Sequence, residues 1–368
     1  MKNKAPLCNY TNNPHLDKSK PLVCTTLSKI PRILKPSFPE KEYVSRKDEK
    51  HSAIHWGQRK LLMSEIEFLL LHGNNPGKNT IVIYAGGAPG DHTPFLSKLF
   101  PHIMFILIDP SPFNIKPTNK IKIIKNFMTN ELSQKFHDQY NGPKNNLLFI
   151  SDVRSVDFRI HKLEETEEEI KNDMKMQQDW YKILKPDAGM LKFRLPWFIN
   201  NDSPQKTNYL AGDIHLPIYG ARTTTETRLI VKGDGSQMKN YDNRKYERQM
   251  FHFNTELRNH IFVHSVKAKG LDCCYDCAAE VFLLRKYYEN TQDDKATMTT
   301  RDIWIGELVD EITKVIGNGH RTLENWQKKN EFKKRIIDNK KHKILYVSSK
   351  KSKKTHPLTK SKTMRKKH

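Results

Sequence analysis

The amino-acid sequence predicts an α/β protein with a doubly wound, mostly parallel, seven-stranded sheet. Three observations predict this class. Short β-branched runs alternate with helical patterns, a glycine-rich loop directly follows one such run, and an acidic residue ends the next run. Strands that alternate with helices favour a parallel sheet covered on both faces. The order strand, glycine loop, helix, strand and acid is also that of a nucleoside-binding βαβ unit.

The first half of the chain supplies the arm and four of the strands. Residues 1–45 carry six prolines and little periodicity, so an extended arm, partly ordered against the body, is expected. Apolar spacing predicts a helix over 58–71, which the polar and glycine-containing run 72–77 ends. Apolar runs predict strands over 81–85, 103–108, 121–124 and 147–150, with a helix over 93–100 inside the βαβ unit.

The second half completes the sheet. Five glutamates crowd the first turns of a predicted helix over 162–184, where acids suit the positive end of the helix dipole. Further strands are predicted over 190–195, 215–219 and 226–231, the last two as a closing hairpin, with helices over 240–262, 274–288 and 303–316. One domain over 46–330 is expected, followed by a disordered basic tail, 331–368, that adds salt-sensitive affinity for RNA.

Composition narrows the class of partner. The 368 residues include 64 Lys and Arg against 41 Asp and Glu, a net charge of +23, which favours polyanions: nucleic acid first, an anionic membrane surface second. No run approaches the roughly 18 apolar residues of a membrane span, and the N-terminus has no apolar region typical of a secretory signal. The odd count of five cysteines in so long a chain favours a reducing compartment.

The loop Gly86-Gly87-Ala88-Pro89-Gly90 lets the backbone turn sharply and approach a ligand closely. Asp109, about 20 residues further on, is placed to accept hydrogen bonds from ribose hydroxyls. The glycine spacing differs from the dinucleotide pattern, and no Lys-Ser/Thr follows to form a phosphate loop. This favours S-adenosylmethionine over NAD or ATP, and a tight turn without a ligand remains the alternative.

Four charged residues, Lys60, Asp152, Lys192 and Glu226, lie at or near predicted strand ends, where a parallel sheet binds its ligands. Lys192 lies inside an apolar strand, and a charge there is rarely buried without a partner. If the four converge, a second ammonium and burial favour the neutral amine of Lys192, which can then take a proton from an alcohol. A structural ion-pair network, or a solvent-facing Lys192, remains equally open.

The order Lys60, Asp152, Lys192, Glu226 resembles the Lys-Asp-Lys-Glu tetrad of FtsJ-like RNA ribose 2′-O-methyltransferases. Seven segments resemble, in order, those of one branch, the poxvirus-type cap-specific mRNA 2′-O-methyltransferases, which double as the small, regulatory subunit of poly(A) polymerase. These segments are GQRKLLMSEIEFL, VIYAGGAPGDH, LIDP, LFISDVRS, LKFRLPW, TETRLIV and NYDNRKYERQM. The resemblance covers residues 56–290 and implies a Rossmann-like S-adenosylmethionine-dependent methyltransferase from a large DNA virus.

The resemblance implies a role for each matched residue. Lys192 would be the general base toward the ribose 2′-hydroxyl, with Asp152 and Glu226 holding it and Lys60 completing the tetrad. The residues implied to bind S-adenosyl-L-methionine are Gln58, Tyr84, Gly86, Pro89, Gly90, His92, Asp109, Val153 and Arg154. Tyr43 and Trp197 would stack the 7-methylguanine of the cap, and Glu247 would read it. The family's second acidic reader corresponds to Ile199 here, with Asp202 as the candidate substitute.

The implied partners are capped mRNA and a poly(A) polymerase catalytic subunit, in the cytoplasm of an infected cell, its viral factory or the virion, without a membrane. Two alternatives stay open: a non-catalytic RNA-binding subunit that stimulates the polymerase, and a methyltransferase for uncapped structured RNA. Arg222 and Arg228 are candidates to face phosphate. The pair Cys274 and Cys277 is interpreted as helix-core cysteines, with no structural metal, because no second cysteine pair appears.

Overall fold

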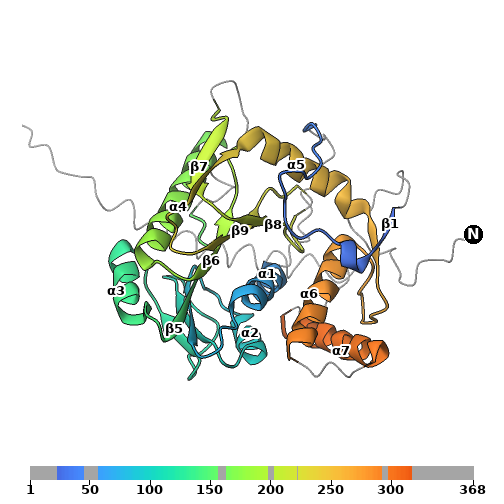
Figure 1. The fold of residues 1–368 in the computed structure, drawn as a ribbon, viewed down its shortest axis with the longest axis horizontal. Helices are drawn as coiled ribbons and strands as arrows, with labels where there is room; N and C mark the ends of the chain where they lie inside the picture. The colour runs from blue at the N-terminus through green and yellow to red at the C-terminus, as the bar shows by residue number, and fades with distance from the viewer. Residues whose placement is uncertain are drawn as a thin grey trace, which may run out of the picture. The chain divides into compact units, whose positions relative to one another are not determined.

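The computed structural model describes residues 23–44, 57–155, 163–197, 203–221, 223–291 and 297–316 (Figure 1). The predicted basic tail, 331–368, lies outside these residues. A seven-stranded sheet forms the centre, in the order β4-β3-β2-β5-β6-β9-β8. Its strands are β2 (Asn79–Ala85), β3 (Met104–Ile108), β4 (Ile121–Ile124), β5 (Asn145–Ser151), β6 (Ala188–Phe193), β8 (Asp213–His215) and β9 (Thr227–Lys232). Six of these strands run in one direction and β9 runs against them, which confirms the predicted fold class.

Helices cover both faces of the sheet. Tyr84 of β2 donates a hydrogen bond to Glu65 of α1 (Gly57–His72), on one face. On the other face lies α4 (Leu163–Leu184), whose Tyr181 ring packs so closely on Gly189 of β6 that a Cβ atom there would lie 2.5 Å from it. The remaining helices are α2 (Thr93–Leu99), α3 (Asn130–Tyr140), α5 (Asn243–Thr255), α6 (Tyr275–Thr291) and α7 (Met298–Ile316). Figure 1 shows α3 beside α4, and α7 beside α6.

Several predicted elements differ from the observed ones. The strand predicted over 215–219 is β8, which ends at His215. The helix predicted over 240–262 begins at Asn243, because residues 238–242 pair with β7 (Lys206–Leu210) as β10 (Met238–Asp242). That helix, α5, ends at Thr255, and a 3-10 turn and β11 (Ile261–Val263) follow. Helix α3, capped by the Thr129 side chain, was not predicted.

Residues 23–44 of the predicted arm pack on the body. Strand β1 (Cys24–Thr26) pairs in parallel with β11, and the Leu27, Ile30 and Leu34 side chains that follow it are buried. The Arg32 guanidinium binds the Glu67 carboxylate of α1, with Nη2–Oε2 at 2.8 Å and Nε–Oε1 at 3.1 Å. A segment that reads as an irregular proline-rich arm is therefore tied to the helix that leads into the sheet.

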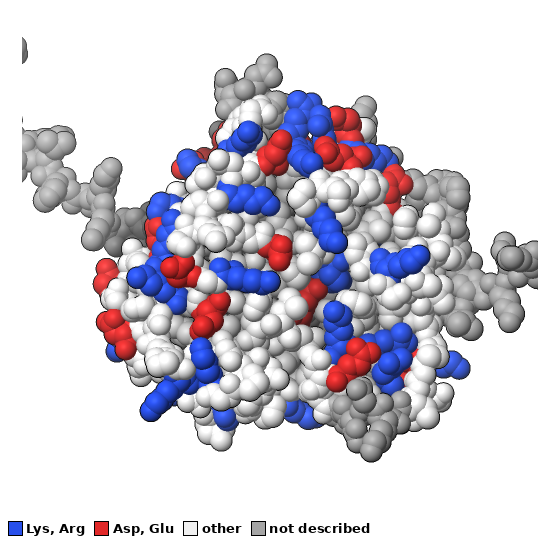
Figure 2. Space-filling view, viewed as in Figure 1, with Lys and Arg blue, Asp and Glu red and all other residues white. Residues whose placement is uncertain are grey.

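Positive charge is unevenly distributed. Residues 317–368, which lie outside the described part of the chain, carry more of the excess positive charge than all the rest together. On the face drawn in Figure 2, Lys and Arg side chains lie among Asp and Glu side chains and form no continuous basic patch. Among the described residues, no helix combines the length and the apolar character that crossing a membrane requires.

We expect replacement of Arg32 by alanine to lower the free energy of unfolding at neutral pH by about 3–5 kcal/mol, because it removes the two-point contact of the buried Glu67 carboxylate with a guanidinium and leaves its contact with His215 Nδ1 at 3.3 Å. Against the effect of burial, Arg32 and His215 together lower the pKa of Glu67 to about 2. A depressed carboxyl pKa stabilises the fold above the unfolded pKa, and this stabilisation is lost as the pH falls through the folded pKa. Urea unfolding between pH 7 and pH 2 measures both effects.

The matched control is Lys29→Ala, which changes an exposed cation of the same segment. Its urea midpoint should stay at the wild-type value. A wild-type midpoint for Arg32→Ala would show that the ion pair does not hold the segment to α1.

Candidate active site

The candidate site lies at the carboxyl ends of the parallel strands. Residues 86–90 follow β2, Asp109 follows β3, Asp152 follows β5, and Lys192 lies one residue before the end of β6. The strand order reverses between β2 and β5, because β2 leads to β3 on one side while β5 lies on the other. Ligands of open α/β sheets bind at such a switch point.

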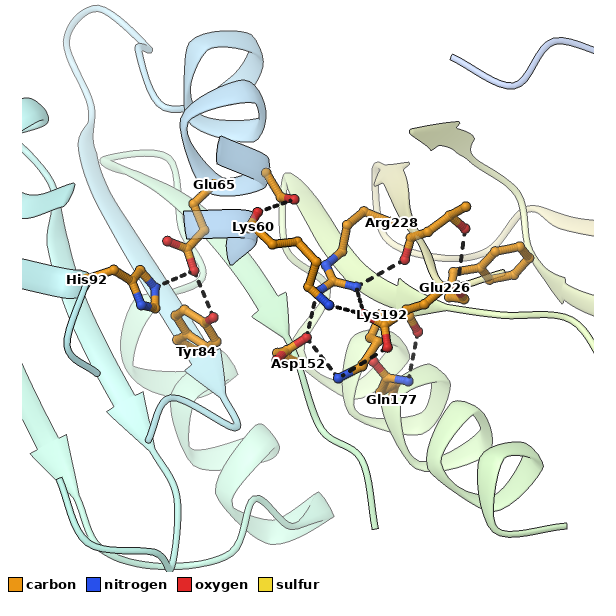
Figure 3. Close-up of polar contacts among 12 residues, drawn as sticks. Lys60, Glu65, Tyr84, His92, Asp152, Gln177, Lys192, Glu226 and Arg228 are labelled. Atoms are coloured by element: carbon orange, nitrogen blue, oxygen red, sulfur yellow. Dashed lines mark hydrogen bonds and ion pairs between the residues drawn. The ribbon is translucent and has the colours of Figure 1, made fainter. Parts of the chain in front are cut away.

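Five side chains at this edge form what we call the charged cluster: Lys60, Asp152, Lys192, Glu226 and Arg228 (Figure 3). The Lys60 ammonium donates to Glu226 Oε1 at 2.7 Å. The Lys192 ammonium lies 3.2 Å from Asp152 Oδ1 and 3.6 Å from Glu226 Oε2. Arg228 binds both carboxylates, Asp152 Oδ1 at 2.7 Å and Glu226 Oε1 at 3.0 Å. The four residues predicted from the sequence therefore converge.

The antiparallel course of β9 brings the cluster together. Because β9 runs against β6, its beginning lies beside the end of β6, and Glu226 immediately precedes it. Lys192 and Arg228 are register partners on these two strands, so their side chains leave the same face of the sheet. That face is covered by α1, which carries Lys60.

The cluster keeps its carboxylates ionised. Burial opposes ionisation, but the Lys192 ammonium and the Arg228 guanidinium lower the pKa of Asp152. Burial likewise opposes the ionisation of Glu226, and Lys192, Lys60 and Arg228 together hold its pKa well below the usual range. The pKa of Lys60 is lowered by burial, against the attraction of Glu226, and also by the neighbouring cations.

The structure corrects the predicted role of Arg228. This residue was a candidate to face phosphate, but its side chain is 6% exposed and binds the two carboxylates of the cluster. The signal for a partner role was its position in an otherwise apolar strand, TRLIV, which is the same signal that singled out Lys192. Arg222, the other candidate, lies outside the described residues.

The glycine loop packs directly against the segment that carries Asp152. Gly86 has φ +82°, and a Cβ atom there would lie 3.0 Å from both the Asp152 carbonyl carbon and the Val153 nitrogen. Asp109 Oδ2 accepts a hydrogen bond from the Ala88 amide at 3.3 Å, and Oδ1 accepts one from the Ser111 amide at 2.8 Å. Each carboxylate oxygen retains acceptor capacity, so Asp109 can also bind a hydroxyl. Gly90, φ +77°, and Pro89 complete the loop.

A second buried network lies beside this loop and links β2 to α1. Tyr84 Oη donates to Glu65 Oε1 at 2.8 Å, and the same oxygen lies 2.8 Å from His92 Nε2. His92 Nδ1 lies 2.7 Å from Gln58 Oε1. Because both ring nitrogens face acceptors, His92 fits this network as an imidazolium, and Glu65 raises the pKa of His92 against the effect of burial.

Three of the residues predicted to bind the methyl donor thus belong to this buried network. Tyr84 and His92 are each 1% exposed, and Gln58 reaches His92 from the first turn of α1. Glu65, on which Tyr84 and His92 converge, was not singled out. An acid in the apolar segment MSEIEFLLL was its only sequence signal.

Arg154 turns from the loop toward α4. Its Nη1 atom lies 3.6 Å from Asp173 Oδ2, and its side chain is 9% exposed. Asp173 also accepts hydrogen bonds from the Ser155 amide at 2.8 Å and from its hydroxyl at 2.6 Å. Val153 is partly buried and packs against the core. The segment after Asp152 is therefore anchored on the face opposite to α1.

The predicted cap-stacking residues also meet. Tyr43 and Trp197 lie with their ring centroids 5.6 Å apart at 74°, and Tyr43 also contacts Phe251 of α5 at 5.3 Å. Glu247 lies one turn before Phe251 on the same helix. Because Tyr43 and Trp197 touch edge to face, no base fits between them in this conformation. Ile199 and Asp202 lie outside the described residues.

Two curated relatives are each named cap-specific mRNA (nucleoside-2′-O-)-methyltransferase. The protein from Fowlpox virus (strain NVSL) is 29% identical over 216 residues, 55% of this chain and 68% of that protein. The protein from Myxoma virus (strain Lausanne) is 28% identical over 225 residues, 57% of this chain and 64% of that protein. The matched stretches thus span about two thirds of the relatives' own length.

A structure of bluetongue virus VP4, described as a multifunctional RNA-capping production line, is 12% identical, with a TM-score of 0.38 over 62% of this chain and 35% of that chain. A family model described as "Poly A polymerase regulatory subunit" matches residues 38–317, most of the chain and the whole of the charged cluster. The resemblance inferred from the sequence is thereby confirmed: the chain belongs to the poly(A) polymerase regulatory subunit family.

Proposed function

We propose that this protein transfers a methyl group from S-adenosylmethionine to the ribose 2′-hydroxyl of the first transcribed nucleotide of 7-methylguanosine-capped mRNA. The observation that carries the proposal is the convergence of Lys60, Asp152, Lys192 and Glu226 beside the glycine loop. The names of the Fowlpox and Myxoma virus relatives support the same reaction.

The residues around the loop fit a nucleoside-bearing methyl donor. Gly86 has no side chain to fill the space against Asp152, and the Asp109 carboxylate, 8% exposed, can accept hydrogen bonds from ribose hydroxyls. When bound, S-adenosylmethionine supplies an electrophilic methyl group on a sulfonium. The Gln58–His92–Glu65–Tyr84 network would then hold the loop in position. The Tyr84 hydroxyl would not bind the donor, because it donates its hydrogen bond to Glu65.

In the proposed reaction, Lys192 in its neutral amine form would accept the proton of the 2′-hydroxyl, whose oxygen would take the methyl group from the sulfonium and leave a neutral thioether. Asp152 and Glu226 orient the Lys192 nitrogen, which lies 3.2 and 3.6 Å from their oxygens. Arg228 and Lys60 position these carboxylates and hold them ionised. Much of the rate enhancement would come from holding the hydroxyl in line with the methyl group.

Replacement of Lys192 by alanine should reduce methyl transfer by about 10²- to 10⁴-fold, the usual contribution of a general base. The assay transfers label from S-adenosylmethionine to short RNAs that differ only at the 5′ end: uncapped, guanosine-capped or 7-methylguanosine-capped. Digestion then locates the label. We expect label on the first ribose, only on the 7-methylguanosine-capped RNA.

Lys232→Ala is the matched control, because Lys232 is exposed and lies at the opposite end of β9 from Glu226. It should keep wild-type activity. Label on all three RNAs would be consistent with the proposed role of the tetrad in methyl transfer, but it would favour uncapped structured RNA as the acceptor. No label on any RNA would overturn the methyl-transfer proposal.

A second function is favoured by the family description, which names a poly(A) polymerase regulatory subunit. We propose that the chain also stimulates a poly(A) polymerase catalytic subunit through a surface separate from the charged cluster. Lys192→Ala should then leave stimulation of poly(A) tail extension within about twofold of wild type, because the substitution removes one amine at a buried site. Loss of both activities in this variant, with its fold intact by circular dichroism, would contradict separate surfaces.

A further inference from the structure

A compact group of sulfur and oxygen donors lies outside the charged cluster, at the start of α6. The Asp272 carboxylate and the Cys274 and Cys277 thiols have their donor atoms within 4.8 Å of one another. The three residues are only 2%, 3% and 4% exposed. Neither cysteine is in a disulfide, and Cys277 Sγ accepts a hydrogen bond from the Tyr219 hydroxyl at 3.9 Å.

The local backbone explains the grouping. The Cys274 amide donates to Asp272 Oδ1 at 2.9 Å, which turns the chain into α6. The Cys277 amide then lies 3.4 Å from Cys274 Sγ, so the first helical turn brings the two sulfurs to one side. The two sulfurs and the Asp272 carboxylate therefore face one another at the start of α6.

A buried histidine stands next to the group. His264 Nε2 lies 2.9 Å from the Asp272 carbonyl oxygen, which can only accept, so Nε2 carries the proton and Nδ1 offers a lone pair. Within the described part of the chain, Nδ1 is buried and has no hydrogen-bond partner. A histidine that binds a metal usually donates its other N–H to a carbonyl or carboxylate in this way.

We propose that Asp272, Cys274 and Cys277 bind one zinc ion, with His264 Nδ1 as the fourth donor. Two thiolates, one carboxylate and one imidazole are donors that tetrahedral zinc accepts, at about 2.0–2.3 Å from the metal. His264 Nδ1 lies outside the group of three, so its coordination requires the 264–274 loop to move Nδ1 toward the three donors. Each thiol loses its proton on binding, so one zinc ion displaces two protons.

A second cysteine pair, the usual sequence signal of a zinc site, is missing from this chain. The donors here are of mixed type, and Asp272 and His264 precede Cys274 by two and ten residues. The proposed ion would fix the loop after β11 to the first turn of α6. That helix contacts α1 through the ion pair of Glu280 with Arg59, so the ion would stabilise the scaffold and take no part in the reaction.

The first test uses the wild-type full-length chain, reduced and stripped of metal with a chelator. Titration with Co²⁺ should produce a sulfur-to-cobalt charge-transfer band that saturates at one ion per chain, and Zn²⁺ should abolish the band. Zinc titration in weak buffer should release about two protons per ion. Absence of both the band and the proton release, with the thiols shown to be reduced, would overturn the proposal.

The second test compares zinc content after loading and desalting. Cys274→Ser combined with Cys277→Ser should lose the bound zinc, whereas Cys24→Ser, at an exposed thiol, should retain about one ion per chain. The chelator should lower the Tm of wild type and of Cys24→Ser but not that of the double variant. Equal zinc content in all three proteins would place any bound metal elsewhere and overturn the assignment.

Discussion

The architecture depends on how α1 buries charge. A charged side chain can leave water only with a partner of opposite charge, and α1 carries four such side chains into the body. Each has a partner from a different part of the chain: Arg59 binds Glu280, Lys60 binds Glu226, Glu65 binds His92, and Glu67 binds Arg32. One helix therefore joins the N-terminal segment, the glycine loop, the sheet edge and α6. The charged cluster takes its position from these pairs.

The pair Lys192 and Arg228 sets the chemistry at the sheet edge. Two cations directly opposite each other on neighbouring strands repel, and so they stay together only because Asp152 and Glu226 lie between them. The two acids are consequently held as carboxylates, and the Lys192 nitrogen is held at a fixed point above the strand end. This fixed position is what the proposed proton transfer requires, since a general base acts only within hydrogen-bond reach of its proton.

The two parts of the proposed substrate site, the charged cluster with its glycine loop and the aromatic pair of Tyr43 and Trp197, are not held equally firmly. The cluster and the loop rest on strands β2, β5, β6 and β9 and on α1, all in the packed core. The aromatic pair is different: Trp197 follows β6, whereas Tyr43 belongs to the N-terminal segment and is 44% exposed. A ring this exposed can rotate away from Trp197, which is the movement that stacking a base between them needs.

Short-range patterns in the sequence determined much of this protein: the strands, the glycine loop and the acids that end strands. They did so because a buried strand, a tight turn and a paired charge each require particular residues within a few positions. Only the tertiary structure decided that Arg228 completes the charged cluster, that Glu65 binds Tyr84 and His92, and that Asp272 joins Cys274 and Cys277. It also decided where α5 begins, because residues 238–242, just before this helix, pair with β7 as strand β10. These outcomes depend on which distant segments meet, and local spacing does not contain that information.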